Sequence, residues 1–584
     1  MGLFCKKNNE GDKPRKKMGC LGKTLIGLVI YFGLCAGIGW WYDNYGNSVS
    51  LEKNSVYKLR LHGVMVEQAP EADPFADALA EVYGRRNVEK VGLDELLSNI
   101  RLAKENDKVL GIYLSGGDLS MAPAGAKTLR DALLDFKQSG KWIVAYAENY
   151  DQLNYYVISV ADNIYVNPVG GVDWNGLTAQ KGYYTRVLQK LGVEMQILKV
   201  GTFKSAVEPF FRTSMSEADR HQTKTYMDGI WSEMRAAVSQ SRGISEEELD
   251  RLADRYMTLQ PQEEYVACGL VDSLVYIEGM DSVLQHLTGT EDYKLYSTAE
   301  MAAVTRKADK ADDKIAIVYA EGEITDDSGD GIVGTKMIRT LKKVGKNKDV
   351  KAVVLRVNSP GGSANASEQI WHAVELLKQQ GLPVVVSMGD YAASGGYYIS
   401  SGADYIYAEP TTLTGSIGIF GIVPNVKGLR EKIGYDIDGI STHDHSALEV
   451  NMIYRGMNDK EFAMMQTMVE RGYDLFTRRC AAGRHTTQEA IKQIGEGRVW
   501  LGKDAMNIGL VDAMGNIDDA IAKAAELAGL SEYAKVYYPQ RKDFLTELME
   551  KIDKTTPEEK IVSKMREMIT QPRILAIEHF PEIK

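Results

Sequence analysis

Residues 384–400 read VVVSMGDYAASGGYYIS. Its three consecutive valines, Val384–Val386, are typical of a strand in the interior of a sheet. Small residues then surround Ser394 and leave its hydroxyl accessible, and a helix is expected to begin at or just after it. The N–H groups and the positive end of that helix would lie beside the hydroxyl, where they could stabilise an oxyanion. The stretch therefore predicts a nucleophilic serine at a strand-to-helix turn.

A second stretch, VVLRVNSPGGS at residues 353–363, repeats this pattern of an apolar strand followed by a tight turn. Gly361 and Gly362 allow the backbone to approach a ligand closely and to point N–H groups at it. Either glycine-rich turn alone is ordinary in an α/β protein. Two of them, separated by one helix-and-strand unit, favour a single site built from both.

The chain also contains an internal repeat. NYDQLNYYVISVADNIYVNP at 149–168 aligns on DYAASGGYYISSGADYIYAEP at 390–410 with one single-residue shift, and the offset before the shift is 241. The tetrapeptide GLVD occurs at 269–272 and again at 509–512, an offset of 240. A period of this size is that of a whole domain, so the sequence predicts a tandem duplication rather than a solenoid.

Within each copy, apolar strands alternate with amphipathic helices, which predicts an α/β fold with largely parallel sheets. Long helices are expected at 215–242 and 457–483. The predicted division of the body is an N-terminal repeat at 51–304, a charged linker at 305–313, a C-terminal repeat at 314–540, and a charged helical tail of unknown role at 541–584.

The N-terminus predicts a membrane anchor. Residues 1–23 contain seven Lys or Arg and two Asp or Glu, and residues 24–42 (TLIGLVIYFGLCAGIGWWY) contain no charged residue. Nineteen helical residues just span a bilayer core of about 30 Å. The apolar run is long and lacks an A-x-A site at its end, which favours an uncleaved transmembrane helix over a signal peptide. The positive-inside rule then predicts that residues 1–23 lie in the cytoplasm and the body outside the cytoplasmic membrane.

Composition excludes some functions. The net charge of −11 over 584 residues, with no basic stripe in the body, argues against nucleic-acid binding. Only two of the five cysteines, Cys268 and Cys480, lie in the body, and they show neither metal-ligand spacing nor a disulfide framework. We therefore expect no metal site and no cofactor.

The two copies differ where chemistry would occur. In the alignment, Leu153 stands opposite Ser394 and cannot act as a nucleophile, while His445 stands opposite Lys204. Each copy has kept only part of a possible site. This difference predicts one composite site per chain.

From the residues alone, two candidates remain for the general base that would activate Ser394. A Ser-His-Asp arrangement would use His443 or His445 with Asp444 or Asp436. The other candidate is Lys204, which can serve if burial and a hydroxyl partner lower its pKa so that neutral amine is present near pH 7. Its neighbours in KVGTFKSAVEP are mostly small or apolar, which favours burial.

Four motifs closely resemble the long, duplicated form of the signal peptide peptidase A family, membrane-anchored Ser-Lys proteases of the ClpP/crotonase fold. They are NSPGGS at 358–363, DYAASGGYYIS at 390–400, TLTGSIGI at 412–419 and GTFKSAVEPF at 201–210. The resemblance runs from the anchor to about residue 540. It implies two tandem ClpP/crotonase-like repeats that follow a single N-terminal transmembrane helix.

The resemblance also implies roles for individual residues. It makes Ser394 the nucleophile, Lys204 the general base and Ser416 a hydrogen-bond partner of the lysine. It assigns the oxyanion hole to backbone N–H groups of Gly361 or Gly362 and of Gly395. It further implies a bowl-shaped homotetramer on the outer, periplasmic face of a bacterial inner membrane, with signal-peptide remnants and other apolar peptides as substrates.

Two other functions stay open at this stage. A crotonase-type enzyme would use the same glycine turns to hold the oxygen of a coenzyme A thioester, although an external location argues against it. An anchored scaffold whose sites have decayed, as the copy with Leu153 has, would not be an enzyme. A serine-directed fluorophosphonate adduct and peptide cleavage that depends on Ser394 would distinguish these alternatives.

Overall fold

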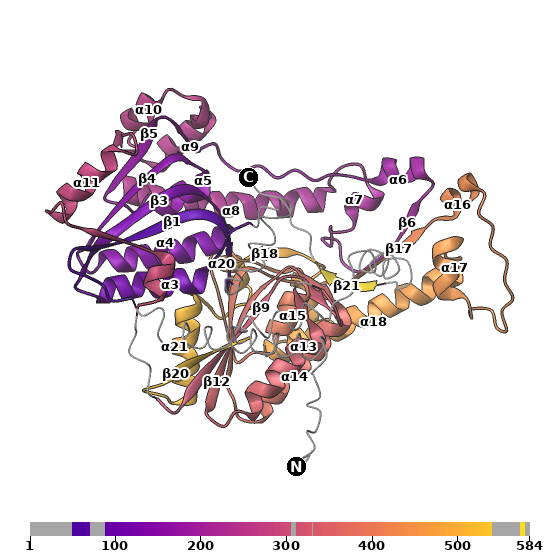
Figure 1. Cartoon of the computed structure of the whole chain (residues 1–584). Helices are drawn as coiled ribbons and strands as arrows, with labels where there is room; N and C mark the ends of the chain where they lie inside the picture. Colours follow the sequence, from indigo (N-terminus) through magenta and orange to yellow (C-terminus); the bar gives the residue numbers. More distant parts are fainter. Residues whose placement is uncertain (1–48, 70–87, 305–310, 330, 540–572, 578–584) are drawn as a thin grey trace, which may run out of the picture.

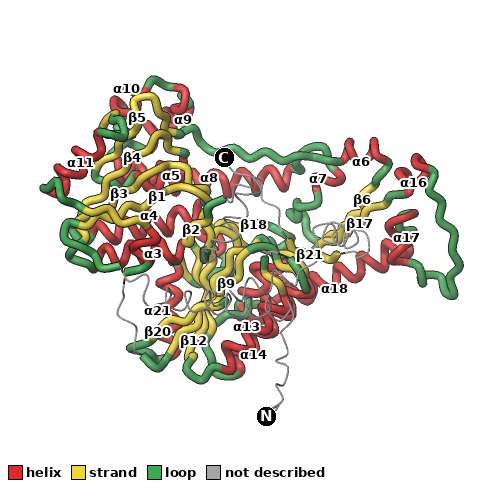
Figure 2. The backbone as a smooth tube through the Cα atoms, viewed as in Figure 1, coloured by secondary structure: helices red, strands yellow, loops and turns green. Residues whose placement is uncertain are grey.

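The computed structural model describes residues 49–69, 88–304, 311–329, 331–539 and 573–577. The predicted cytoplasmic tail and the predicted anchor at 24–42 lie outside these residues. Within the described ranges, no helix is long and apolar enough to cross a membrane. The described residues form three sheets with helices packed around them (Figures 1 and 2).

The first repeat is built on a seven-stranded sheet in which every pairing is parallel. The strand order is β2-β1-β3-β4-β5-β7, and β8 also pairs with β1. The strands are β1 (Ser55–Val66), β2 (Lys90–Gly92), β3 (Val109–Ser120), β4 (Trp142–Tyr150), β5 (Asn163–Val172), β7 (Ser273–Leu274) and β8 (Lys294–Ser297). The main crossover helices are α3 (Leu93–Glu105), α4 (Pro123–Lys137) and α5 (Gln152–Ile158).

The second repeat has an eight-stranded sheet of order β18-β16-β14-β12-β9-β20, with β15 between β14 and β19. All of its pairings are parallel except β16 with β18. The strands are β9 (Lys314–Glu321), β12 (Val350–Ser359), β14 (Val384–Ala393), β15 (Tyr405–Ala408), β16 (Leu413–Gly415), β18 (Val499–Leu501), β19 (Ala513–Met514) and β20 (Ala534–Tyr538).

The valine run of β14 is buried because helices cover both faces of this sheet. Val384 and Val386 belong to one apolar cluster and Val385 to another, on opposite faces. Helix α14 (Ala364–Gln379) contributes to the first cluster and α21 (Ile517–Ala528) to the second. A continuous apolar run is the pattern expected for a parallel strand covered on both sides. The predicted α/β fold with parallel sheets is confirmed.

A third, mixed sheet joins the repeats. Its order is β11-β10-β13-β21-β17-β6. The strands are β6 (Glu194–Lys199), β10 (Ile324–Thr325), β11 (Ile332–Val333), β13 (Gly361–Ser363), β17 (Phe420–Asn425) and β21 (Arg573–Ile577). Strand β6 of the first repeat pairs antiparallel with β17 of the second, from Phe420↔Lys199 to Asn425↔Glu194. This pairing brings the segment that follows β6 to the second repeat.

The two long helices expected from the sequence are α8 (Glu217–Arg242) and α18 (Asp459–Gly483). Ser216 and Asn458 cap their N-termini by accepting hydrogen bonds from backbone N–H groups three residues on. The helices α6 (Thr185–Leu191), α7 (Glu208–Phe211), α16 (Lys427–Ile433) and α17 (Leu448–Tyr454) lie with β6 and β17 in an arm that projects from the body (Figure 1).

Short helices complete the two repeats. In the first they are α9 (Glu246–Asp254), the 3₁₀ turn η1 (Met257–Leu259), α10 (Gln262–Ala267), α11 (Gly279–Thr288) and α12 (Thr298–Ala302). In the second they are α13 (Gly334–Lys346), α15 (Gly395–Ser400), α19 (Gln488–Ile494) and α20 (Gly502–Asn507).

The prediction of a helical tail at 541–584 is wrong for residues 573–577, which form strand β21. This segment, RILAI, pairs antiparallel with β13 on one side and with β17 on the other. The abundant Lys and Glu of the tail suggested helix, but pairing with two strand edges satisfies the backbone groups of an extended segment at this place. The rest of the predicted tail, and residues 305–310 of the predicted linker, lie outside the described residues.

Candidate active site

Ser394 lies in the single-residue turn between β14 and α15, as the sequence predicts. Its backbone has φ 55° and ψ −114°, a conformation that non-glycine residues rarely adopt. Two hydrogen bonds hold it there: its N–H donates to the Gly415 carbonyl over 2.8 Å, and its carbonyl accepts from the Tyr398 N–H over 2.8 Å. Ser394 is fully buried in the structure, so the accessible hydroxyl expected from the sequence is not observed.

Lys204 follows β6 and is fully buried. Two glycines of the second repeat leave room for its side chain. A Cβ at Gly497 would stand 2.7 Å from Lys204 Cβ, and a Cβ at Gly418 would stand 3.2 Å from Lys204 Cδ. The neighbouring Phe203 N–H donates to the Glu496 carbonyl over 2.9 Å. The lysine of the first repeat is therefore enclosed by backbone of the second.

The structure brings Lys204, Ser394 and Ser416 together. Lys204 Nζ lies 2.9 Å from Ser394 Oγ, 2.9 Å from Ser416 Oγ and 3.3 Å from the Ser416 carbonyl oxygen. The Ser416 hydroxyl donates to the Gly497 carbonyl over 3.3 Å, so its oxygen accepts from the lysine. A neutral amine has two N–H groups and one lone pair. A charged lysine donates in all three contacts, whereas a neutral amine that donates twice to Ser416 would keep its lone pair for the Ser394 hydroxyl.

The glycines predicted for the oxyanion hole lie in β13 and at the start of α15. Gly361 and Gly362 have φ 104° and 157°, and the Gly361 N–H donates to Ser359 Oγ over 3.2 Å. Helix α15 packs closely on this turn, because a Cβ at Gly396 would stand only 2.5 Å from the Ser359 carbonyl oxygen. The turn before β13 thus packs against the start of α15, the helix that directly follows Ser394.

The histidine alternative finds no support in the geometry. His443 and His445 lie in the segment between α16 and α17, at the far end of the arm from α15 (Figure 1). The His443 ring contacts Thr442 Oγ1 at 3.0 Å, and His445 Nδ1 lies 3.8 Å from Glu461. Asp436 and Asp444 in the same segment are exposed. Leu153, opposite Ser394 in the alignment, lies in α5 and packs on the core of the first repeat.

Gln222 of α8 holds the segment that carries Lys204, and the sequence analysis missed it. Its Nε2 donates to the Phe203 carbonyl and to Ser205 Oγ, both over 3.1 Å, and its Oε1 accepts from the Val499 N–H over 3.3 Å. The side chain therefore ties the Lys204 segment to β18. The sequence offered one indication, a polar residue on the buried face of a predicted helix, because such a residue needs hydrogen-bond partners.

The turn at Glu496 and Gly497 was also missed. Glu496 has φ 51° and Gly497 has φ 76°, and the Gly497 N–H donates to the Ile417 carbonyl over 2.8 Å. This turn thus contacts both the lysine segment and the Ser416 segment. The two glycines of GEGR at 495–498 were the available signal for a special backbone geometry.

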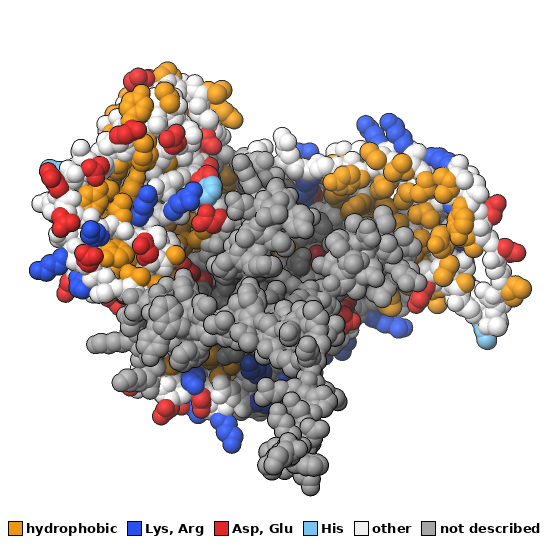
Figure 3. Space-filling view, in the orientation of Figure 1, with side chains coloured by type: hydrophobic (Ala, Val, Ile, Leu, Met, Phe, Trp, Pro, Cys, Tyr) orange, Lys and Arg blue, Asp and Glu red, His pale blue; other side chains and the backbone are white. Residues whose placement is uncertain are grey.

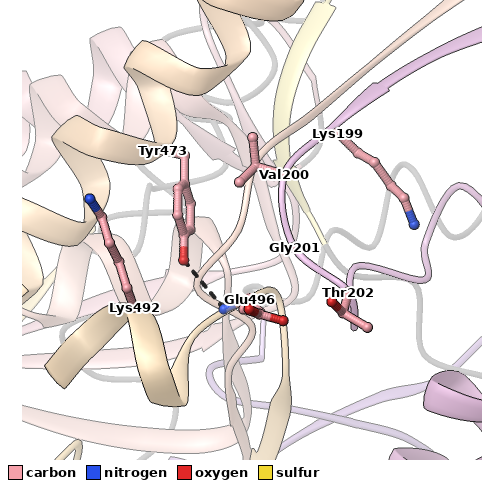
Figure 4. A pocket seen from close by; sticks show the side chains of 7 residues that line it. All are labelled: Lys199, Val200, Gly201, Thr202, Tyr473, Lys492 and Glu496. Atoms are coloured by element: carbon pink, nitrogen blue, oxygen red, sulfur yellow. Dashed lines mark hydrogen bonds between the residues drawn. The ribbon is translucent and has the colours of Figure 1, made fainter. Parts of the chain in front are cut away.

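A pocket of about 570 Å³ lies beside the segment that leads to the lysine (Figure 4). In it, the Glu496 N–H donates to the Tyr473 hydroxyl over 3.4 Å. Its lining combines the end of β6 with α18, α19 and the turn after α19: Lys199, Val200, Gly201, Thr202, Tyr473, Lys492 and Glu496. The lining does not include Ser394 or Lys204, so this pocket is not the reaction site itself.

A buried charged cluster lies at the contact between the repeats. Glu67 of the first repeat and Arg356 of the second form a bidentate ion pair, with Nε–Oε2 at 2.8 Å and Nη2–Oε1 at 3.1 Å. Asp390 accepts from the Gly125 N–H over 2.8 Å, and burial raises the pKa of its carboxyl group. Burial, and then the charge of Glu67, raise the pKa of Glu321 to about 7. Arg356 also donates to Ser387 and to the Met388 carbonyl of β14, so the strand that leads to Ser394 lies beside charged groups of both repeats.

Comparison with known proteins agrees with this architecture. The chain matches peptidase family S49 over residues 135–291 and 376–531. The two matches begin 241 residues apart, which is the offset of the internal repeat. The predicted tandem duplication is thus confirmed, while the ClpP/crotonase assignment of each repeat stays a prediction.

Relatives cover most of the chain. It is 35% identical to Protease 4 of Haemophilus influenzae over 88% of this chain and 86% of that protein. It is 35% identical to Protease 4 of Salmonella typhi over 90% of this chain and 87% of that protein. It is 31% identical to the chloroplastic serine protease SPPA of Arabidopsis thaliana over 76% of this chain and 67% of that protein.

These matches define the class of protein as a serine protease. The chain belongs to peptidase family S49. The resemblance inferred from the four sequence motifs is therefore confirmed, and neither the crotonase-type enzyme nor the decayed scaffold is supported.

Proposed function

We propose that this serine protease uses Ser394 as nucleophile and Lys204 as general base, and that it degrades released signal peptides and other apolar peptides outside the cytoplasmic membrane. The observation that carries the proposal is the distance of 2.9 Å between Lys204 Nζ and Ser394 Oγ. The distance lies within the range in which a base takes a proton directly.

In the first step, neutral Lys204 accepts the hydroxyl proton while Ser394 Oγ attacks the peptide carbonyl carbon. The two contacts from the amine to Ser416 support this role, because they leave the lone pair directed at the serine. Removing an ammonium group from water favours its neutral form, and Lys204 is fully buried. A lysine in this setting can act as base without a histidine.

The attack places negative charge on the carbonyl oxygen, and backbone N–H groups of Gly395 and of Gly361 or Gly362 are proposed to stabilise it. The Gly361 N–H would first exchange its hydrogen bond with Ser359. Protonated Lys204 then gives its proton to the leaving amine, which releases the C-terminal product. Water, activated by the same lysine, hydrolyses the ester on Ser394 and restores the free enzyme.

The proposed location rests on the sequence of the N-terminus. Seven basic residues in 1–23 precede the uncharged run at 24–42, which supports an anchor with its N-terminus in the cytoplasm and the body on the periplasmic side. Such an anchor would hold the site near the bilayer, where apolar signal-peptide remnants are released.

The proposed homotetramer has support from the surface of the arm. Apolar side chains gather over β6, β17, α6 and α17 (Figure 3). Val187, Leu191, Ile433 and Val450 are each at least half exposed. An exposed apolar patch of this kind is typical of a surface that contacts another protein, and here we propose further copies of the chain.

The test compares variants of the full chain on casein and on a synthetic signal peptide. Ser394→Ala should abolish cleavage. Lys204→Arg keeps the positive charge but cannot release a proton, so we expect activity to fall by about 10² to 10⁴ while the fold is kept. His443→Ala and His445→Ala are the matched controls and should retain most activity. An active arginine variant with an inactive histidine variant would overturn the Ser-Lys assignment.

A further inference from the structure

Glu67 reaches from the first repeat into the segment of the second repeat that leads to the proposed oxyanion hole. It directly follows β1 and is 5% exposed. Its Oε1 accepts from Asn358 Nδ2 over 3.0 Å, and the same carboxylate forms the ion pair with Arg356. Asn358 lies in β12 and precedes Gly361 by three residues. A side chain of the first repeat therefore contacts the segment that ends in the glycine turn.

The side chain of Asn358 also contacts the strand that leads to the nucleophile. Its Oδ1 accepts from the Tyr391 N–H over 3.1 Å, and Tyr391 precedes Ser394 by three residues. The backbone at Asn358 is held as well, because its carbonyl accepts from the Gly322 N–H over 2.9 Å. One amide group thus joins β12, just before the glycine turn, to β14, just before Ser394.

Glu67 determines which way the amide of Asn358 faces. An ionised carboxylate can only accept hydrogen bonds, so the NH₂ group of the amide faces Glu67 and its oxygen faces the Tyr391 N–H. The NH₂ group has a second, longer contact of 3.4 Å with Asp390 Oδ2. The approach of the two side chains needs the space at Gly389, where a Cβ would stand 2.6 Å from Glu67 Oε1 and 3.0 Å from Asn358 Cγ.

This arrangement bears on the chemistry of the site. Oxyanion-hole donors stabilise the transition state only when their N–H groups are held at hydrogen-bond distance from the place where negative charge forms. In the proposed mechanism these donors are the N–H of Gly395, next to Ser394, and that of Gly361 or Gly362. The amide of Asn358 connects the backbone just before each of these two places.

We infer that Glu67 and Asn358 are positioning residues: Glu67 orients the Asn358 amide, and this amide fixes the glycine turn relative to Ser394. The inference rests on the proposed function, because it takes Ser394 as nucleophile and the glycine turn as part of the oxyanion hole. It gives the first repeat a second role in the composite site, besides the supply of Lys204. Loss of the contact should lower kcat and leave the binding of uncleaved peptide unchanged.

The first test exchanges donor and acceptor at this contact in the full chain. Asn358→Asp removes the NH₂ group and puts a second carboxylate against Glu67, so kcat for a quenched-fluorescent apolar peptide should fall by about 10²-fold with little change in KM. Adding Glu67→Gln returns an NH₂ group to the contact, while the new carboxylate can still accept from the Tyr391 N–H. The double variant should therefore regain about tenfold in kcat over Asn358→Asp alone. A double variant that regains nothing would overturn the inference.

A transition-state analogue separates positioning from substrate binding. A peptide boronic acid forms a tetrahedral adduct with Ser394 Oγ, and an oxygen of that adduct occupies the oxyanion hole. Asn358→Asp should raise its inhibition constant by about the factor by which kcat falls. In chains that carry Ser394→Ala, the same substitution should change the affinity for the uncleaved peptide by less than about twofold. An equal loss in both affinities would overturn the inference, because the contact would then serve substrate binding.

Thr128→Val is the matched control for a merely structural role. Thr128 Oγ1 of the first repeat donates to Glu409 of the second over 2.8 Å, so this variant also loses a buried hydrogen bond between the repeats. It should lower the free energy of urea unfolding and leave kcat unchanged. If Asn358→Asp behaves in the same way, with cleavage that still depends on Ser394, the inference is overturned and the proposed function stands. Cleavage that persists in Ser394→Ala would contradict the proposed function, and the inference with it.

Discussion

Substitution of Glu321 at the contact between the repeats should make the protein more stable at alkaline pH. Glu321 ends β9, and its two carboxylate oxygens accept from the Glu67 N–H over 3.2 and 3.3 Å. Burial raises the pKa of its carboxyl group from 4.5 to about 7, and the charges of Glu67 and Asp390 add to the effect, while Arg356 and the hydrogen bond from Glu67 oppose it. The folded chain therefore holds this proton more tightly than the unfolded chain.

The sign and size of the effect follow from the two pKa values. Because the folded state binds more protons between pH 4.5 and 7, the free energy of unfolding falls as pH rises through this range and levels off above it. A pKa difference of about 2.5, at about 1.36 kcal/mol for each pKa unit, gives a penalty of about 3 kcal/mol when Glu321 is fully ionised. Glu321→Gln cannot ionise, yet its side-chain oxygen can still accept from Glu67.

The assay is urea unfolding at a series of pH values, followed by tryptophan fluorescence. Relative to the unaltered chain, Glu321→Gln should gain about 2 to 3 kcal/mol of unfolding free energy between pH 5 and pH 8. Glu323→Gln makes the same chemical change at an exposed residue two positions further on and should show no such trend. A stability difference between Glu321→Gln and the unaltered chain that does not change with pH would show that ionisation of Glu321 does not destabilise the fold.

Three further predictions concern Lys204 as the proposed base and the predicted membrane anchor. Gly497→Ala would put a Cβ 2.7 Å from Lys204 Cβ, so we expect kcat to fall by about 10²-fold with little change in KM; equal kcat values would contradict the packing around the lysine. Ser416→Ala removes the hydroxyl that lies 2.9 Å from Lys204 Nζ. Steady-state kinetics should show a loss of about tenfold in kcat. An unchanged kcat would mean that this contact does not position Lys204. Protease added outside spheroplasts should digest the body and leave the first twenty or so residues protected on a blot, and full protection of the body would show the opposite orientation.

The strand, turn and helix around Ser394 could be predicted because residues that are close together in the sequence determine them. A valine run, small residues and the return of helical periodicity within seventeen positions predict a strand, a turn and a helix around Ser394. The alignment of the two copies also predicts that each contributes different residues to one site, because Leu153 stands opposite Ser394 and His445 opposite Lys204. Helix α8 begins within two residues of the predicted start, because Ser216 is a standard N-cap at a recognisable position.

The features that were missed depend on contacts between distant parts of the chain. Gln222 and Gly497 support Lys204 only because β6 crosses to pair with β17, more than 200 residues away. The ion pair of Glu67 with Arg356 joins residues 289 positions apart. A local pattern can mark a residue as unusual, as the glycines of GEGR do, but it does not show which distant residue that residue contacts. The helical prediction for the tail fails at residues 573–577 for the same reason. A strand there depends on pairing with β13 and β17, which the tail sequence does not reveal.

Active-site titration of the full chain with a fluorophosphonate, read by intact mass and peptide mapping, counts the reactive serines. One composite site per chain predicts one adduct, on Ser394, with labelling absent in Ser394→Ala and slowed by about 10² or more in Lys204→Arg. Two adducts per chain, or a single adduct on another serine with Ser394→Ala still labelled, would contradict the account.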